Sequence, residues 1–180
     1  AQTRLGGGRV HHAMRTVAMA KKALAMMCER ALSRTVQGEP LAQKQFVQGM
    51  IAESFLQLEQ FRLLVLYTAW HIDQGHREQA RLYIAAVKIQ MAEVLHDIVR
   101  RAVHLHGALG CSNELPLMRW WLAVPVMGIA DGPTEVHMLT VARQLLKQYQ
   151  AYSGPWPPEF LPEAVPQARL RLGLEPEPGS

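Results

Sequence analysis

The sequence has few cysteines, no long apolar run and no basic cluster. Cys28 and Cys111 are its only cysteines, and neither belongs to a CxxC or zinc-ligand pattern, so both are expected to be reduced packing residues. No apolar run approaches the roughly 18 residues of a transmembrane helix, and no signal peptide is evident, so a soluble protein is expected. The net charge is +4 without any Lys/Arg run. A phosphate-bearing small molecule fits that charge as well as nucleic acid does, and no nucleic-acid partner is predicted.

The histidines and acidic residues show no metal-binding spacing. His104 and His106 are two residues apart, about 200° around a helix, so they cannot ligate one ion. There is no HExxH, and no repeated Glu-x-x-His pair of the kind that builds metal sites in helical bundles. The G-x-S-x-G, P-loop and Rossmann glycine patterns do not occur either. No metal site is predicted.

What the sequence does contain is helical periodicity. Apolar residues recur at spacings of three, four and seven in three stretches, and no period-2 run is long enough for a sheet. Gly38, Pro40, Gly75 and Gly107 interrupt the pattern. The three predicted apolar faces are Val10, Met14, Val17, Leu24, Met27 and Ala31; then Val47, Ile51, Phe55, Leu58, Phe61, Val65 and Ile72; then Ile84, Val87, Met91, Leu95, Ile98 and Ala102.

This pattern predicts an all-α protein with two parts. Three antiparallel helices of about thirty residues, closed by a fourth from about Pro133 to Tyr149, make an up-down-up-down four-helix bundle over residues 1–152. Residues 153–180 contain seven of the eleven prolines, mixed with Glu, Gly and Ser. Such a segment buries little surface, so it is predicted to be a Pro-rich tail that holds no helix.

The segment Asp131-Gly132-Pro133 lies where an apolar helix restarts after a break. A carboxylate between two helices can project into a cleft, as a catalytic base must, and helix N-terminal amides beside it can receive anionic groups. The same residues also fit an ordinary turn followed by a helix cap. From the spacing alone, both interpretations stay open.

Four motifs, in the right order, give residues 9 to about 148 a resemblance to the C-terminal helical domain of the acyl-CoA dehydrogenase family. The form Asp-Gly-Pro-x-Glu-Val-His is similar to the branch whose eukaryotic members handle long acyl chains, and to related bacterial enzymes. The four motifs are Gly8-Arg9-Val10-His11-His12, Ser33-Arg34-Thr35-Val36-Gln37-Gly38-Glu39-Pro40-Leu41, the turn from Val103 to Gly110, and Asp131-Gly132-Pro133-Thr134-Glu135-Val136-His137 followed by Val141-Ala142-Arg143.

The resemblance implies an FAD-dependent enzyme that oxidises an acyl-CoA thioester to the 2-enoyl-CoA. In the family, a carboxylate removes the α-proton while a hydride passes from the β-carbon to FAD, and the matching carboxylate here is Asp131. Because the α-proton of a thioester is weakly acidic, such a base must be desolvated and aimed. Some relatives carry the base on the first helix instead, at the position of Gly8, which leaves Asp131 as the candidate. Arg9 and Gly132 are implied to lie beside the substrate.

The resemblance also implies contacts with FAD from two parts of the chain. One set matches residues that reach the pyrophosphate and adenosine of a neighbouring subunit's FAD, and the other matches residues on the cofactor side of the base. This chain departs from the family at Gln37, where an aromatic is usual, and at His104 and Ala108, where Gln and Gly are usual. The first set is Arg34, Gln37, His104, Gly107 and Gly110, and the second is Pro133, Thr134 and Glu135.

The family's N-terminal helical domain and middle β-domain do not occur in these 180 residues. Because those domains wall the pocket, the chain alone is expected to be catalytically poor. The implied partners are acyl-CoA, the two missing domains, further subunits of a homo- or heterotetramer, and an electron acceptor of the electron-transfer flavoprotein type. A bacterial protein of this kind is expected in the cytoplasm, and a eukaryotic one in mitochondria or peroxisomes. Two alternatives are a non-catalytic assembly subunit that contributes FAD contacts to a partner, and a helical interaction module without a ligand.

Overall fold

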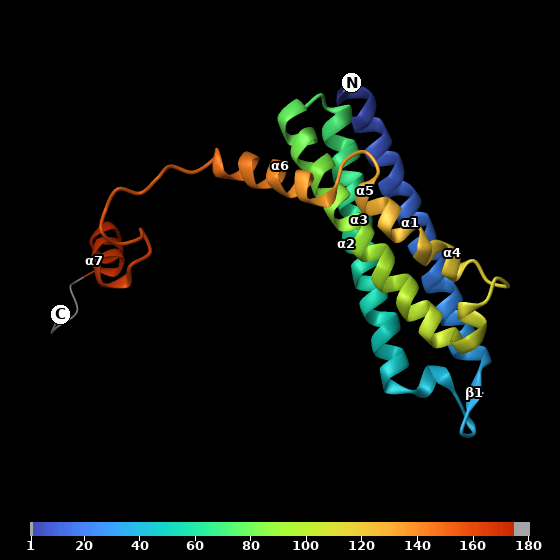
Figure 1. Cartoon of the computed structure of the whole chain (residues 1–180). Helices are drawn as coiled ribbons and strands as arrows, with labels where there is room; N and C mark the ends of the chain where they lie inside the picture. Colours follow the sequence, from blue (N-terminus) through green and yellow to red (C-terminus); the bar gives the residue numbers. More distant parts are fainter. Residues whose placement is uncertain (1, 175–180) are drawn as a thin grey trace. The chain divides into compact units, whose positions relative to one another are not determined.

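The computed structural model describes residues 2–174, with side chains from residue 6 onward, and it confirms the all-α prediction. Three long helices dominate: α1 (Gln2–Ser33), α2 (Gln45–Asp73) and α3 (Arg77–His106). Consecutive helices run antiparallel, and α3 packs against both of the others (Figure 1). The apolar face predicted for α3 is confirmed, since Val87, Met91, Leu95, Ile98 and Ala102 are completely buried.

The connections lie where the glycine and proline signals predicted them. A minimal hairpin, β1 (Thr35–Val36) and β2 (Glu39–Pro40), follows α1 and leads through the 3-10 turn η1 (Leu41–Gln43) into α2. Gln37 and Gly38 form its tip, with φ of 54° and 80°. The α2–α3 turn passes through Gly75 at φ 70°. These left-handed backbone conformations suit glycine. Other residues adopt them at an energetic cost, and then as single residues in turns.

Three side chains predicted to face the core are instead exposed. Met14 of α1 is 58% exposed, and Phe55 and Ile72 of α2 are 54% and 42% exposed. The buried face of α1 consists mainly of small residues that let α3 approach closely, together with Met27; the small residues are Ala13, Thr16, Ala20, Ala23 and Ala31. On α2, apolar residues occur all round the helix, so periodicity alone chose the wrong members. Likewise Cys111 is exposed rather than packed, whereas Cys28 is half-buried; both thiols are free.

The chain beyond α3 is broken into short helices. The 3-10 turn η2 (Gly107–Cys111) is followed by α4 (Leu117–Leu122) and α5 (Val124–Ile129), which pack on α3. Pro125 lies in the first turn of α5, where a proline is tolerated, and it separates the two helices. The fourth helix expected from about Pro133 is α6 (Thr134–Leu146), and it leads away from the long helices after its first turns (Figure 1).

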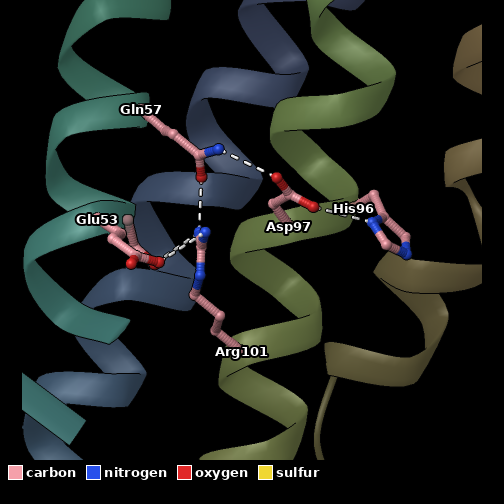
Figure 2. Close-up of polar contacts among 6 residues, drawn as sticks. Glu53, Gln57, His96, Asp97 and Arg101 are labelled. Atoms are coloured by element: carbon pink, nitrogen blue, oxygen red, sulfur yellow. Dashed lines mark hydrogen bonds and ion pairs between the residues drawn. The ribbon is translucent and has the colours of Figure 1, made fainter. Parts of the chain in front are cut away.

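A polar network joins α2 to α3 (Figure 2). The Arg101 guanidinium donates to Gln57 Oε1 at 2.6 Å and lies 3.0 Å from the Glu53 carboxylate. Gln57 Nε2 donates to Asp97 at 3.0 Å, and Asp97 also contacts His96 Nδ1 at 3.1 Å. Burial opposes the charge of Asp97, but these hydrogen bonds and the Arg101 charge hold the pKa of Asp97 below its ordinary value. Each charge in the network therefore has a polar or ionic partner.

The contacts divide the chain into residues 1–144 and residues 145–180. The second unit contains α7 (Leu161–Arg171), so the prediction that the Pro-rich segment holds no helix is wrong. Pro162 lies in the first turn, where its missing N–H has no helical acceptor, and only Pro166 removes a helical hydrogen bond. Trp156 and Phe160 stack with ring centroids 4.7 Å apart before the helix.

Candidate functional site

Asp131 lies in the turn between α5 and α6, in a backbone conformation that is rare for a residue with a side chain. Its φ is 59°, and Gly132 follows at φ 113°. Asp is one of the few residues that tolerate the left-handed region, whereas the second conformation favours glycine. The two residues reverse the chain and turn the carboxylate of Asp131 toward α1, where its side chain is 24% exposed.

The carboxylate of Asp131 occupies the space that a side chain at position 8 would need. An ideal Cβ built on Gly8 would lie 2.6 Å from Asp131 Oδ2, closer than any real contact. Some members of the family to which the sequence shows a resemblance carry their base on the first helix, at the position that matches Gly8. The structure thus brings the two alternative base positions to one point in space, with glycine at one and a carboxylate at the other.

Two side chains of α1 flank the carboxylate. Arg9 Nε donates to the backbone carbonyl of Asp131 at 3.0 Å, and Arg9 Nη2 lies 4.0 Å from where a Cβ on Gly132 would be. His12 Nε2 is 3.8 Å from Asp131 Oδ2. The predicted trio of Arg9, Asp131 and Gly132 is therefore assembled. The arginine thus helps to hold the backbone of the turn.

Beneath the turn lie two buried side chains that the sequence analysis did not single out. Lys88 of α3 is completely buried and donates to the Met127 carbonyl at 2.5 Å. His137 is 3% exposed, and its Nε2 lies 3.1 Å from the Cβ position of Gly132. The signal for Lys88 was its place on the apolar stripe of α3, one turn after Ile84. His137 ends the motif that begins at Asp131, but the motif indicated no role for it.

Burial shifts the pKa of both side chains downward. Burial lowers the pKa of Lys88, the charge of Arg9 adds to this, and the charge of Asp131 opposes it. Burial, then the charges of Arg9 and Lys88, holds the pKa of His137 below 6.5, although backbone groups of Asp131 and Gly132 act in the opposite sense. The surroundings of His137 under the turn therefore disfavour its protonated form.

Next to the turn, a cavity of about 1020 Å³ opens between α1, the α2–α3 turn and α6. Val10, Met14 and Ile84 give it an apolar wall. Its polar lining is mainly basic and includes Arg9, His11, His71, Arg77 and Arg81, with Asp73 as an acidic member. Such a lining suits a ligand with an apolar part and an anionic part.

The residues matched to FAD contacts fall into two groups. Pro133, Thr134 and Glu135 start α6 beside Asp131, and Thr134 Oγ1 donates to the Gly128 carbonyl at 3.3 Å. Arg34 and Gln37 are exposed at the hairpin, which lies at the same end of the bundle as the end of α3 (Figure 1). Arg9 and Arg34 are separated by 25 residues, about 37 Å along a helix. The two groups of residues therefore lie at different ends of α1.

The turn after α3 has its own structural reasons for glycine. Gly107 ends the helix at φ 65°, and a Cβ on Gly110 would lie 2.5 Å from the Val103 carbonyl. Close packing thus requires Gly110 whether or not a cofactor binds nearby. His104 is exposed at this end of α3, while His106 is buried and its Nδ1 lies 2.8 Å from the Ala102 carbonyl.

Residues 2–174 contain neither a cluster of metal ligands nor a membrane-spanning helix. Within this range, no group of three or more His, Cys, Asp or Glu side chains is placed to hold a metal ion. No helix in the same range combines the length and the apolar character needed to cross a membrane.

Comparisons with known proteins agree on one family. Residues 1–146 match the model for the acyl-CoA dehydrogenase C-terminal domain. The chain is 43% identical over 148 residues to a probable acyl-CoA dehydrogenase of Mycobacterium tuberculosis, covering 82% of this chain and 36% of that protein. It is 38% identical over 152 residues to (R)-benzylsuccinyl-CoA dehydrogenase of Thauera aromatica, covering 84% of this chain and 37% of that protein.

Solved structures give the same answer. A putative acyl-CoA dehydrogenase from Mycobacterium abscessus superposes with a TM-score of 0.79 at 39% identity, covering 83% of this chain and 37% of that one. Butyryl-CoA dehydrogenase from Megasphaera elsdenii gives 0.74 at 28% identity, covering 79% and 37%. The chain thus spans a little over a third of these relatives. The chain belongs to the acyl-CoA dehydrogenase family and corresponds to its C-terminal helical domain.

Proposed function

We propose that this chain is the C-terminal domain of an FAD-dependent acyl-CoA dehydrogenase that converts an acyl-CoA into the 2-enoyl-CoA, with Asp131 as the base. The observation that carries the proposal is the placement of the Asp131 carboxylate. It is held against Gly8 by a left-handed turn, and Arg9 Nε donates to the backbone carbonyl of the same turn. A base needs such a fixed placement, because its carboxylate must be aimed at the α-proton within hydrogen-bond reach.

In this mechanism the side chains of the domain handle the proton. Asp131 Oδ2 takes the α-proton of the thioester, and Arg9 keeps the turn in place through the Asp131 carbonyl. Gly132, without a side chain, leaves room for the substrate beside the base. FAD, when bound, accepts the hydride from the β-carbon. Pro133, Thr134 and Glu135, at the start of α6, are then on the cofactor side of the base.

The cavity beside the turn supports acyl-CoA as the substrate class. Its apolar wall of Val10, Met14 and Ile84 suits the hydrocarbon part of a ligand, and the exposed guanidinium groups of Arg77 and Arg81 suit phosphates. The relatives include proteins named for acyl-CoA, butyryl-CoA and benzylsuccinyl-CoA substrates, so the CoA thioester is what those names share.

The other end of the bundle suits a second FAD. Arg34 presents an exposed guanidinium, the group that pairs with a pyrophosphate, and Gln37 projects from the same hairpin. His104, Gly107 and Gly110 form the adjoining turn, which would receive the adenosine portion. This end lies about 37 Å along α1 from Arg9, which fits a second cofactor position. The resemblance to the family implies that the FAD held there belongs to a neighbouring subunit of a homo- or heterotetramer.

The partners follow from this arrangement. The N-terminal helical domain and the β-domain of the family close the pocket, and the 180 residues alone are expected to turn over poorly because the base would face water. One solved structure, 26% identical, bears a title about the electron transferring flavoprotein of Acidaminococcus fermentans. We propose an acceptor of that type and, for a bacterial protein, a cytoplasmic location.

The decisive experiment follows the flavin absorbance of the complete gene product while a series of acyl-CoA substrates is added. The wild type should carry flavin and be bleached by at least one acyl-CoA. Asp131→Asn, which keeps shape and hydrogen bonding, should bind flavin and substrate but lose about 10²- to 10⁴-fold in reduction rate. Flavin that no acyl-CoA reduces would favour the assembly subunit, and absence of flavin the interaction module. Normal rates in Asp131→Asn would refute Asp131 as the base.

A further inference from the structure

Lys88 is the largest side chain of the described residues that is completely buried. Removing an ammonium group from water is costly unless it is paired, and burial does lower the pKa of Lys88. Yet no carboxylate within residues 6–174 lies within ion-pair distance of its nitrogen, and its recorded acceptor is the Met127 carbonyl. A well-packed apolar side chain would be cheaper at this position, so stability alone does not explain the lysine.

The Met127 carbonyl belongs to the last turn of α5, immediately before the Asp131 turn. The final carbonyls of a helix have no partner inside it, and a cation there also complements the helix dipole. Lys88 therefore caps α5 from a different helix. The next turn is continued by the hydrogen bonds from Ala130 N–H to the Val126 carbonyl and from Gly132 N–H to the Ile129 carbonyl. Because the Asp131 turn follows α5 directly, fixing the end of α5 also fixes the start of this turn.

His137 holds the other side of the turn. Its ring is buried directly under Gly132, with Nε2 3.1 Å from where a Cβ would be. That nitrogen has no well-formed hydrogen bond within the described part of the chain. The turn is thus enclosed by Lys88 below α5, His137 below Gly132 and Arg9 on the Asp131 carbonyl. In two of these three contacts, the side chains of Lys88 and Arg9 donate to backbone carbonyls.

We propose that Lys88 is a positioning residue of the reaction: by capping α5 through the Met127 carbonyl, it fixes the Asp131–Gly132 turn and with it the place of the Asp131 carboxylate. The proposal rests on the proposed function of Asp131 as the base. It assigns Lys88 no contact with substrate or cofactor. A lysine that served only the packing of α3 would show its effect in global stability, whereas a positioning lysine shows it in the turn and in kcat.

The test compares Lys88→Met with wild type in the complete gene product, using Lys22→Met, an exposed lysine on α1, as the matched control. Hydrogen–deuterium exchange is followed in residues 126–137 and, for reference, in the cores of α1 and α3. In Lys88→Met, amide exchange in residues 126–137 should accelerate roughly 10- to 100-fold, because a charge-assisted hydrogen bond is lost. Exchange in α1 and α3 should stay unchanged.

The same variant should leave Tm unchanged or higher, because the cost of burying an ammonium group is gone. Its kcat should fall by up to about 100-fold with KM nearly constant, since a small displacement of the base impairs the chemical step and not binding. Lys88→Gln, whose amide is one atom shorter, restores a donor without the charge and should recover part of the protection. It also decides the question if Lys88→Met does not fold.

Two results would overturn the proposal. One is unchanged exchange in residues 126–137 together with unchanged kcat. The other is a lower Tm with faster exchange throughout α1, α3 and the turn, which is the result for a packing residue. The exchange measurement needs no turnover. If the turn loosens as predicted but wild type reduces no flavin, Lys88 keeps its structural assignment and the proposed function fails instead.

Discussion

Two polar clusters of this domain, each with a residue on α3, hold their charged side chains differently. In the Arg101 cluster (Figure 2), the guanidinium meets Glu53 at 3.0 Å and Gln57 at 2.6 Å, and Asp97 is hydrogen-bonded by Gln57. In the Asp131 cluster, Lys88 and Arg9 each donate to a backbone carbonyl, and His12 Nε2 lies 3.8 Å from the carboxylate.

The difference indicates what each cluster is for. A charge whose partners are all provided by the protein has little left for a ligand, so the Arg101 cluster should fix α2 against α3. A carboxylate whose backbone is fixed by neighbouring side chains can be aimed at a substrate. Substitutions in the first cluster should therefore change stability, and substitutions in the second should change activity.

The largest effect should come from Gly8→Ala, which attacks the Asp131 cluster without touching a charge. The new Cβ would lie 2.6 Å from Asp131 Oδ2, so the carboxylate must move. A displacement of that size costs about 100-fold in kcat, equivalent to about 2.7 kcal/mol. Because the obstructed group is the end of a side chain and alanine favours the helix, the free energy of unfolding should not fall.

Gly7→Ala is the matched control for this prediction. Gly7 lies in the same turn of α1, and nothing lies within 4 Å of the position of its Cβ. This variant should keep full kcat and show the same helix stabilisation. Equal rates for the two variants in a flavin reduction assay would mean that the carboxylate of Asp131 does not act from the place it occupies beside Gly8.

The next effect should come from Arg101→Met, which leaves Gln57 and Glu53 without their shared donor and Asp97 without a nearby positive charge. Breaking a buried ion pair typically costs 3–5 kcal/mol, but Glu53 is 65% exposed, so about 2 kcal/mol is expected here. Arg100→Met, at the exposed neighbouring position, should stay within about 0.5 kcal/mol of wild type. Urea unfolding measures both, and flavin reduction by Arg101→Met should remain near wild type if the two clusters are independent.

The sequence predicted the framework of the domain better than its polar interior. The face of α3 was correct because a long, regular stripe of Val, Met, Leu and Ile leaves one solution. Binary patterning treats polar residues as surface, so it could not place Lys88 or Arg101 inside. Phe55 was misplaced because α2 is apolar on more than one side, and α7 was missed because proline was counted as a helix breaker at a position that tolerates it.

The candidate site came from resemblance rather than from periodicity. Two of the four motifs supplied Arg9 and the pair Asp131 and Gly132, which the structure brings together, although their roles stay predictions. The spatial equivalence of Gly8 and Asp131 required the left-handed turn at φ 59°, which no pattern of residue types specifies. His137 was visible as the last letter of the motif, but only its burial under Gly132 indicates what it does.

The smallest effect separates the clusters by pH. The pKa of His137 is held below its ordinary 6.5 mainly by burial, so the unfolded chain takes up a proton first as pH falls. Stability from this group is complete above about pH 6.5 and is lost as pH falls toward the lower folded value. The pKa of Asp97 is held below its ordinary 3.8, so the Arg101 cluster loses its contribution only below about pH 4.

Denaturant unfolding between about pH 3 and pH 8 should therefore show two separable slopes. His137→Gln should flatten the upper window but not remove it, because burial and His76 also lower the pKa of His71. Asp97→Asn should flatten the lower window alone. His104→Gln, at an exposed position, is the control for replacing a histidine, and it should leave both slopes as they are. If His137→Gln left the upper slope at its wild-type value, the imidazole under Gly132 would have to be accessible to protons in the folded state. The enclosure of the Asp131 turn would then be looser than its contacts indicate.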